Sequence, residues 1–241
     1  KTVTGVACVK RDGPDGDADA GFVAAALTAL LSIPVVDIGG FLPIILNPAN
    51  QLLHPCILWD LTVDQTAPWP EAPLFYESVT PRAAALLHET SDELQAIKRA
   101  LLDRDPSLWL GAVMPIDDAL VAAYGDDVGD TSSLQRIIAT NRAYAGIRTP
   151  VVDVAPGQGG GVMANFGSRF LLEDIPYGLV VVRGVADLVG VAVPAIDRLI
   201  RWGQEKMGKR YLDDDGRLAG ADVADSGAPA RYGVVDVKDL G

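Results

Sequence analysis

Cysteine and long apolar runs are scarce in this sequence, and both shortages exclude classes of protein. Two cysteines among 241 residues, Cys8 and Cys56, cannot form a disulfide framework and lack the spacing of metal ligands. A reducing compartment, the cytoplasm, is therefore the expected location. No run of about eighteen apolar residues occurs except one interrupted by prolines, asparagines and a histidine, so we expect no membrane span.

Positive charge is also in short supply. The chain has 20 basic and 32 acidic residues, which gives a formal net charge of −12. Nucleic acids and anionic membranes attract basic surfaces, so neither is an expected partner. The hydrophobic content of 49% is that of a globular protein, and 241 residues can bury the core of one large or two small domains.

The apolar pattern and the helix-start signals predict a mainly α fold with little strand. A capping box, in which a helix begins at Ser or Thr with Glu or Gln three residues later, is formed by Thr90 with Glu93, and another begins at Ser132. Roughly five to seven helices are expected around one core. The predicted helices cover residues 20–32, 91–105, 117–124, 133–147, 176–188 and 194–208.

Two stretches are predicted to be loops. Residues 62–81 combine several prolines with Trp69, Phe75 and Tyr76, which favours an ordered loop anchored by aromatic side chains, and such loops often border ligand pockets. Residues 150–167 contain GQGGG and favour a flexible loop. No GxGxxG spacing in a strand–turn–helix context occurs, so we discount phosphate binding there.

The first ten residues, KTVTGVACVK, alternate like a β-strand and lack the apolar core of a signal peptide. Residues 33–38 can form a second short strand, but no obvious partner for the first strand follows in the sequence. We therefore expect that residues 1–16 are a strand and linker from a preceding domain, that residues 17–241 are a helical domain, and that the chain was cut from something longer.

The first candidate site lies in the run FLPIILNPANQLLHPCILWDL at residues 41–61, which is otherwise apolar and is predicted to be a kinked helix. Asn47, Asn50 and His54 fall at i, i+3 and i+7 and would share one helix face. A lone histidine in an apolar stretch is usually a structural residue with satisfied hydrogen bonds. The two asparagines beside His54 make this face a candidate site.

The second candidate cluster is Arg169, Glu173 and Asp174, directly before Pro176. Arg169 can bind an anion, and Asp174 supplies a carboxylate at the entry to a predicted helix. Taken alone, the cluster is more typical of a solvated salt bridge. The second histidine, His88, has no repeated acidic or metal-binding cluster around it and is interpreted as a structural or surface residue.

Together, NPANQLLHP at 47–55 and RFLLEDIPYGL at 169–179 resemble the two signature segments of the opine dehydrogenases, the octopine and nopaline dehydrogenase family. The segments GVAVPAIDRLIRWGQEKMGK and APARYGV resemble later parts of the same family, in the same order. The resemblance implies a multi-helix domain like the C-terminal domain of 6-phosphogluconate dehydrogenase. It also implies that the N-terminal strand belongs to a preceding dinucleotide-binding Rossmann domain.

The resemblance implies reductive condensation of an amino acid with an α-keto acid through an imine. His54 would be the catalytic acid/base with Asp174 as its partner, and Arg169, Asn50 and Asn47 would bind substrate. Asn47 has a second explanation, which is capping of the bend at the following proline. The cofactor would be NAD or NADP, bound mainly by a domain absent from this chain, because no GxGxxG followed by an acidic residue occurs. We expect the isolated chain to be inactive.

The residue types suit this chemistry independently of the family. Imidazole transfers protons near neutral pH, a carboxylate orients it, and the guanidinium of Arg169 can bind a substrate carboxylate bidentately. Two alternatives stay open: a dehydrogenase of the same two-domain plan that acts on a hydroxy acid or keto acid, and a non-catalytic helical module that binds a small acid or mediates dimerisation. A homodimer is a possible assembly. A large distance between His54 and Asp174 would favour the second alternative.

Overall fold

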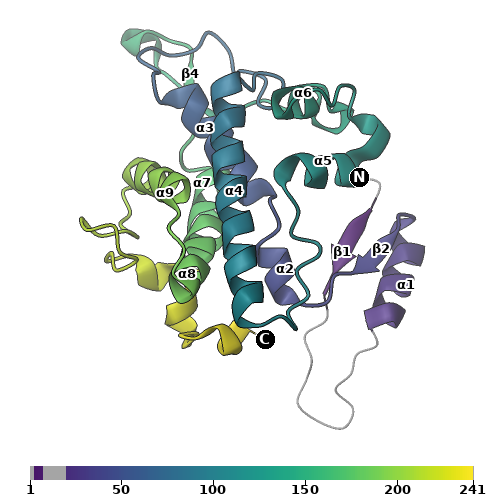
Figure 1. Cartoon of the computed structure of the whole chain (residues 1–241). Helices are drawn as coiled ribbons and strands as arrows, with labels where there is room; N and C mark the ends of the chain where they lie inside the picture. Colours follow the sequence, from purple (N-terminus) through teal and green to yellow (C-terminus); the bar gives the residue numbers. More distant parts are fainter. Residues whose placement is uncertain (1–2, 8–19, 241) are drawn as a thin grey trace.

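The computed structural model describes residues 3–7 and 20–240, and this part of the chain is mainly α-helical, as predicted. Figure 1 shows a bundle around the long helix α4 and a smaller strand–helix–strand unit at its side. No helix in these residues is long and apolar enough to cross a membrane.

The core forms where α3 (Asn50–Thr62) packs along α4 (Pro81–Arg104). Helices α7 (Arg169–Leu172), α8 (Val180–Val189) and α9 (Pro194–Met207) complete the bundle on one side of this pair (Figure 1). The core side chains are mainly aliphatic and almost fully buried, as expected when apolar area removed from water drives the packing. Leu52, Leu87, Ile97, Leu179 and Ile196 are examples with no more than 2% of each residue exposed.

The predicted capping box at Thr90 is wrong, because the helix that contains it begins ten residues earlier. Thr80 is the N-cap residue of α4, and its hydroxyl accepts hydrogen bonds from the backbone N–H groups of Arg82 and Ala83. Proline at the first helical position supports the same start. Thr90 lies inside the helix, where its hydroxyl donates to the carbonyl oxygen of Leu87.

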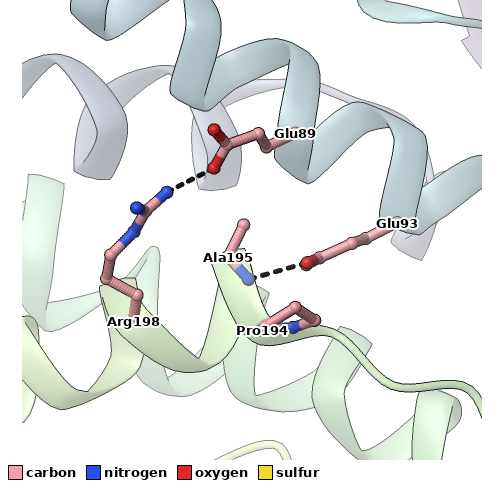
Figure 2. Close-up of a pocket in the computed structure, with 5 residues that line it drawn as sticks. All are labelled: Glu89, Glu93, Pro194, Ala195 and Arg198. Carbon is pink, nitrogen blue, oxygen red and sulfur yellow. Dashed lines mark hydrogen bonds and ion pairs between the residues drawn. The ribbon is translucent and has the colours of Figure 1, made fainter.

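Glu93, the second residue of the predicted capping box, has a different role. The carboxylate of Glu93 accepts hydrogen bonds from the backbone N–H groups of Ala195 (2.7 Å) and Ile196 (2.9 Å), the first free donors of α9. Figure 2 shows the hydrogen bond from Ala195 to Glu93 beside the ion pair of Arg198 with Glu89, and these residues line a pocket of about 350 Å³. An acidic residue of α4 thus stabilises the positive end of α9.

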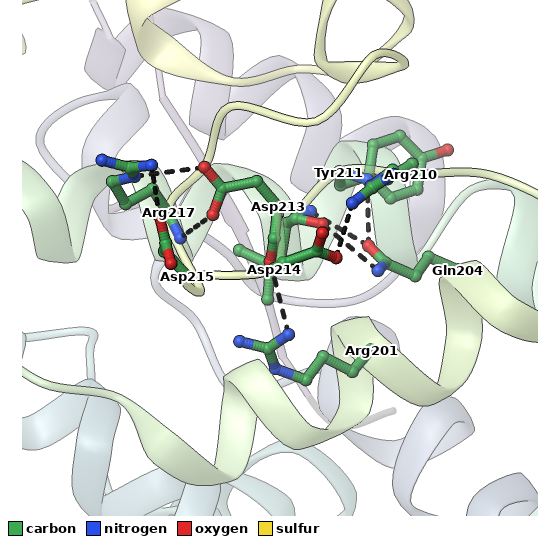
Figure 3. Close-up of polar contacts among 9 residues, drawn as sticks. Arg201, Gln204, Arg210, Tyr211, Asp213, Asp214, Asp215 and Arg217 are labelled. Atoms are coloured by element: carbon green, nitrogen blue, oxygen red, sulfur yellow. Dashed lines mark hydrogen bonds and ion pairs between the residues drawn. The ribbon is translucent and has the colours of Figure 1, made fainter.

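The chain after α9 is held by side chains of that helix, as Figure 3 shows. The amide oxygen of Gln204 accepts hydrogen bonds from the backbone N–H groups of Tyr211 (2.9 Å) and Leu212 (3.0 Å). The Arg201 guanidinium donates to the carbonyl oxygen of Asp213 at 3.4 Å. The acidic turn at residues 213–217 is therefore attached to α9 and has a structural role. Its carboxylates form ion pairs with Arg217 and Arg210.

The helix predicted over residues 133–147 is wrong in length, because α6 ends at Ala139 and only a 3-10 turn at Arg142–Tyr144 follows, whereas the other remaining helices are present with small shifts of their ends. The helix expected to start at the Ser132 capping box begins one residue later, after Ser133, whose hydroxyl accepts from the Arg136 N–H. The helix expected to open at Pro176 begins with a π-helical turn, Ile175–Leu179 (η4), before α8. The other bounds are α1 Ala20–Leu31, α2 Phe41–Ile45, α5 Ile116–Tyr124 and α6 Leu134–Ala139.

Strand β1 (Thr4–Val6) pairs in parallel with β2 (Val35–Asp37), and α1 connects them (Figure 1). The expectation that the first strand lacks a partner is wrong, because the segment predicted as a second short strand supplies it. Apolar side chains of this unit are exposed, including Phe22 (70%) and Leu30 (78%). The boundary predicted between residues 16 and 17 lies outside the described residues.

The glycine-rich segment is more ordered than the predicted loop. Strands β3 (Val151–Asp153) and β4 (Val162–Ala164) pair antiparallel, and the glycines lie in the connection between them. Gly161 has a φ of 82°, and a Cβ there would lie 2.3 Å from the Trp69 carbonyl oxygen, so only glycine allows this approach. The hairpin therefore contacts the proline-rich loop, where Trp69 exchanges backbone hydrogen bonds with Val162.

The predicted kinked helix over residues 41–61 is instead two helices, α2 and α3, separated by residues 46–49. Pro48 lies in the break, where a missing N–H disfavours helix and the preceding residue is pushed toward extended conformations. Pro55 lies inside α3, and the helix continues through it. Asn47 therefore does not share a helix with Asn50 and His54.

Candidate functional site

His54 and Asp174 are 120 residues apart in sequence, and the fold brings them into contact. Nδ1 of His54 lies 2.7 Å from Oδ2 of Asp174. His54 is on α3 and is 4% exposed, while Asp174 caps the π-helical turn η4 and its side chain is 16% exposed. An ionised carboxylate only accepts hydrogen bonds, so Nδ1 of the imidazole donates to it.

Two features of local structure position Asp174. Its backbone carbonyl accepts the Leu179 N–H at 2.9 Å, which closes the wide π-helical turn, a geometry that occurs often at functional sites. The same turn packs closely against α3 at Gly178, where an added Cβ would lie 2.4 Å from Cβ of Gln51. Glycine at this position lets the backbone of Asp174 approach the helix that carries His54.

The other imidazole nitrogen has a partner that sequence reasoning did not assign to the site. Nε2 of His54 lies 2.8 Å from the hydroxyl of Tyr76, which comes from the aromatic loop between α3 and α4. Burial is the main cause that raises the pKa of Tyr76, and the negative charge of Asp174 adds to it, while Arg169 opposes it. The phenol stays protonated and can donate to Nε2 when the imidazole is neutral.

Aromatic rings enclose the imidazole. Phe170 of α7 stacks on His54 with centroids 3.8 Å apart and 12° between the ring planes, and Phe75 meets it edge-on at 5.8 Å. Tyr144 stacks on Tyr76 at 4.1 Å. These contacts shield the imidazole of His54 from water and fix the orientation of its ring. The interpretation of residues 62–81 as an aromatic loop indicated Tyr76, whereas no signal in the sequence indicated Phe170 or Tyr144.

Arg169 lies near this pair, but its side chain is turned to solvent. It is the first residue of α7, its side chain is 66% exposed, and Nε lies 3.6 Å from the Glu173 carboxylate one turn later. The three residues of the predicted cluster at 169–174 therefore have different environments. Asp174 contacts His54, whereas Arg169 and Glu173 form a pair on the surface. Because this pair is on the surface, the Arg169 guanidinium is also accessible to an anion from solvent.

Asn50 and Asn47 line a cavity of about 360 Å³, whose lining includes Leu53, the residue before His54, but not His54 or Asp174. Asn50 is the exposed first residue of α3, one turn before His54, and Asn47 is half-buried in the break between α2 and α3. Tyr144, which stacks on Tyr76, forms another part of the wall. The structure thus brings both asparagines to one cavity, although they do not share a helix face as predicted.

The other histidine and the acidic residues give no sign of a metal centre in the described part of the chain. No group of three or more His, Cys, Asp or Glu side chains there has a metal-binding arrangement. His88 is exposed, as predicted, and its Nε2 lies 2.8 Å from Asp117. Cys56 is buried and free, and burial raises the pKa of its thiol, so it is not a nucleophile.

The site can move protons and can orient a carbonyl or an amine, because a buried imidazole has a carboxylate on one nitrogen and a phenol on the other. The residues present do not supply a dinucleotide-binding motif, since a parallel strand pair without GxGxxG offers no glycine-rich turn for a pyrophosphate. A nicotinamide cofactor therefore does not fit this chain alone.

Comparison with solved structures matches the whole arrangement. Octopine dehydrogenase in a complex with NADH and L-arginine superposes with a TM-score of 0.88 and 34% sequence identity, covering 100% of this chain and 58% of that chain. A second structure of octopine dehydrogenase, with NADH and agmatine, gives the same values.

Comparison of sequences agrees. Octopine dehydrogenase of Pecten maximus is 41% identical over 189 residues, which cover 76% of this chain and 45% of that protein. Tauropine dehydrogenase of Arabella iricolor is 35% identical over 196 residues, covering 81% and 48%. The chain thus spans about half the length of the relatives it matches. The family model for the alpha-helical domain of NAD/NADP octopine/nopaline dehydrogenase matches residues 38–207, and the chain belongs to this family.

Proposed function

We propose that this chain is the substrate-binding and catalytic domain of an NAD(P)-dependent opine dehydrogenase, which condenses an amino acid with an α-keto acid and reduces the imine. The observation that carries the proposal is the 2.7 Å contact between Nδ1 of His54 and Oδ2 of Asp174, in a site enclosed by aromatic rings. Buried imidazole–carboxylate pairs supply the proton transfers that such a condensation requires.

His54 is the acid/base in this proposal. The amine of the amino acid attacks the keto carbon, and one of its protons passes to the former carbonyl oxygen to give a carbinolamine. The protonated imidazole of His54 then donates a second proton to this hydroxyl, which leaves as water, and the imidazole takes the remaining proton from the nitrogen as the imine forms. Asp174 stabilises the charged imidazolium form of His54. Because its carboxylate holds Nδ1, the other ring nitrogen, Nε2, points away from Asp174. NADH or NADPH, held by a domain outside this chain, would supply the hydride for the reduction of the imine. Arg169 and Asn50 bind the substrate, by pairing with a carboxylate and by hydrogen bonding from the cavity wall.

The strand–helix–strand unit fits the edge of a larger nucleotide-binding domain. A parallel pair of strands is normally covered on both faces, whereas α1 and β2 expose Leu30, Leu31 and Val36. The relatives are about twice as long as the matched region. A preceding Rossmann domain would cover these side chains and hold the cofactor, so we expect this chain alone to be inactive. The cytoplasmic location also stays a prediction.

The two alternatives make different demands on the site. A hydroxy-acid or keto-acid dehydrogenase would use the same imidazole–carboxylate pair without an amine. A non-catalytic module would not need the pair, and the short distance between His54 and Asp174 weighs against it. No observation specifically favours a homodimer.

The test is steady-state oxidation of NADH and NADPH by the full-length protein with pyruvate, with and without a panel of amino acids. We expect amine-dependent turnover that falls by about 10²–10⁴ in His54→Ala and in Asp174→Asn. His88→Ala, a histidine on the surface, is the matched control and should keep full activity. Turnover that does not depend on amine would support the keto-acid dehydrogenase, and turnover that survives both substitutions would refute the role of the pair.

A further inference from the structure

The imidazole of His54 is restrained in two different ways. Asp174 and Tyr76 hold its two nitrogens, at 2.7 Å from Nδ1 and 2.8 Å from Nε2. Phe170 lies flat on one face of the ring, with centroids 3.8 Å apart and 12° between the planes, whereas Phe75 meets the imidazole at 5.8 Å and 64°. Phe170 therefore supplies the parallel contact that limits tilting of the imidazole plane.

One of the two hydrogen bonds has to open during the proposed reaction. Because Asp174 holds Nδ1, a proton that passes between the imidazole and a substrate uses Nε2, the nitrogen that the phenol of Tyr76 contacts. While Nε2 serves the substrate, the bond at Nδ1 is the remaining polar restraint, and a ring held at one nitrogen can still tilt about that bond. The contact with Phe170 involves neither nitrogen, so it persists through this step and holds the plane.

The position of Phe170 is itself fixed by the helix that carries it. Phe75 is fully buried and packs on the Phe170 ring, with centroids 4.9 Å apart. The next residue, Leu171, is also fully buried and anchors α7, which packs against α3. Successive side chains of an α-helix point about 100° apart, so Arg169 can face solvent while Phe170 meets the imidazole. One short helix thus carries the exposed arginine and the ring that restrains His54.

We infer that Phe170 is a positioning residue of the proposed reaction, whose ring holds the imidazole of His54 in the plane from which Nε2 exchanges a proton with the substrate. The inference rests on the proposed opine dehydrogenase function. Phe170 has no group that can exchange a proton, so it acts through His54. A misplacement of about 1 Å can lower turnover about a hundredfold, so loss of this contact has a measurable effect on catalysis.

The experiment measures kcat and KM of the full-length protein with pyruvate and the amino acid that gives the fastest turnover. Leucine fills much of the same space without a flat face, so kcat of Phe170→Leu should fall about ten- to a hundredfold while KM for pyruvate stays near its wild-type value. Phe170→Tyr keeps the ring and should keep most of the wild-type kcat. Phe166→Leu is the matched control, because Phe166 is also half-buried but packs edge-on against Trp202, at 6.0 Å.

Two further measurements separate positioning from a purely structural role. A stacked aromatic ring shields the protons beneath it, so the Hε1 and Hδ2 NMR signals of His54 should move downfield in Phe170→Leu and stay in place in Phe166→Leu. In a double-mutant cycle with Asp174→Asn, Phe170→Leu should lower kcat by a smaller factor than in the wild type, because both substitutions act on the same imidazole.

The outcomes distinguish this inference from the proposed function. A wild-type kcat in Phe170→Leu, or an equal loss in Phe166→Leu, would overturn the positioning role and leave the opine dehydrogenase function intact. Independent effects of Phe170→Leu and Asp174→Asn in the cycle would do the same. Absence of amine-dependent turnover in the wild type would overturn both.

Discussion

The hydroxyl of Tyr76 lies 2.8 Å from Nε2 of His54, on the side of the imidazole opposite to Asp174. The carboxylate can only accept a hydrogen bond, and the raised pKa of Tyr76 keeps its phenol protonated. These two partners therefore assign the proton of the neutral imidazole to Nδ1 and leave Nε2 as an acceptor.

Tyr76→Phe should free this acceptor while keeping the ring that stacks on Tyr144. A buried nitrogen without a partner costs about 1–3 kcal/mol, so we expect the free energy of unfolding to fall by that amount and kcat/KM to fall about tenfold. Two-bond ¹H–¹⁵N spectra should still place the proton on Nδ1, because Asp174 keeps accepting it, while the Nε2 signal should move toward that of a nitrogen without a hydrogen bond. Tyr232→Phe, at a tyrosine that is 65% exposed, is the control. An Nε2 signal that stays at its wild-type position in Tyr76→Phe would show that Tyr76 does not hydrogen-bond this nitrogen.

Arg169→Lys should weaken binding of the keto acid with little effect on folding. The substitution keeps the charge but removes the planar fork that binds a carboxylate bidentately, so KM for pyruvate should rise about tenfold. The side chain is 66% exposed and its pair with Glu173 is on the surface, so the free energy of unfolding should change by less than about 0.5 kcal/mol. Glu173→Gln removes that pair and leaves the guanidinium, and it should leave KM unchanged. Equal effects of the two substitutions would contradict a substrate-binding role for Arg169.

Gly178→Ala should push η4 away from α3. The new Cβ would lie 2.4 Å from Cβ of Gln51, and neither backbone can move without disturbing the core, so we expect a loss of about 1–3 kcal/mol in the free energy of unfolding. Turnover should fall as well, because the same movement separates Asp174 from His54. The control is Gly157→Ala, where a Cβ meets nothing within 4 Å. Chemical denaturation and steady-state kinetics measure the two effects, and wild-type values for both in Gly178→Ala would refute the packing argument.

Glu93→Gln should change how stability depends on pH. Burial raises the pKa of Glu93 above its ordinary value, although the N–H groups of Ala195 and Ile196 lower it in part. The folded state therefore binds a proton more tightly than the unfolded state, and this group's contribution to stability falls as pH rises from the ordinary glutamate pKa through the raised one. The stability of the wild type minus that of Glu93→Gln should decrease over this range in urea unfolding series. A difference that increases with pH would show that the two N–H donors outweigh burial.

Much of the fold could be predicted from local sequence signals. The helices α1, α5 and α9 were predicted close to their observed bounds because each has a strong composition or a start signal such as Pro194, and these act within a few residues. The wrong prediction of a helix start at Thr90 also came from a local signal. A capping-box pattern is also compatible with the middle of a longer helix, and Thr80 with Pro81 ten residues earlier provided the stronger start. The glycines between β3 and β4 suggested only a loop, since pairing of the flanking strands is a contact that composition does not encode.

In the candidate site, too, some features could be predicted from the sequence, whereas others depend on the tertiary structure. The sequence by itself determined that His54, Asp174 and Arg169 have the residue types for proton transfer and carboxylate binding, because chemistry depends on side-chain identity. Only the tertiary structure decided that Nδ1 of His54 meets Asp174 and that Nε2 meets Tyr76, since these contacts join three segments far apart in the chain. It also decided that the two asparagines line one cavity although they do not share a helix. The shape and charge of a cavity depend on which elements surround it, and packing of the whole chain sets that.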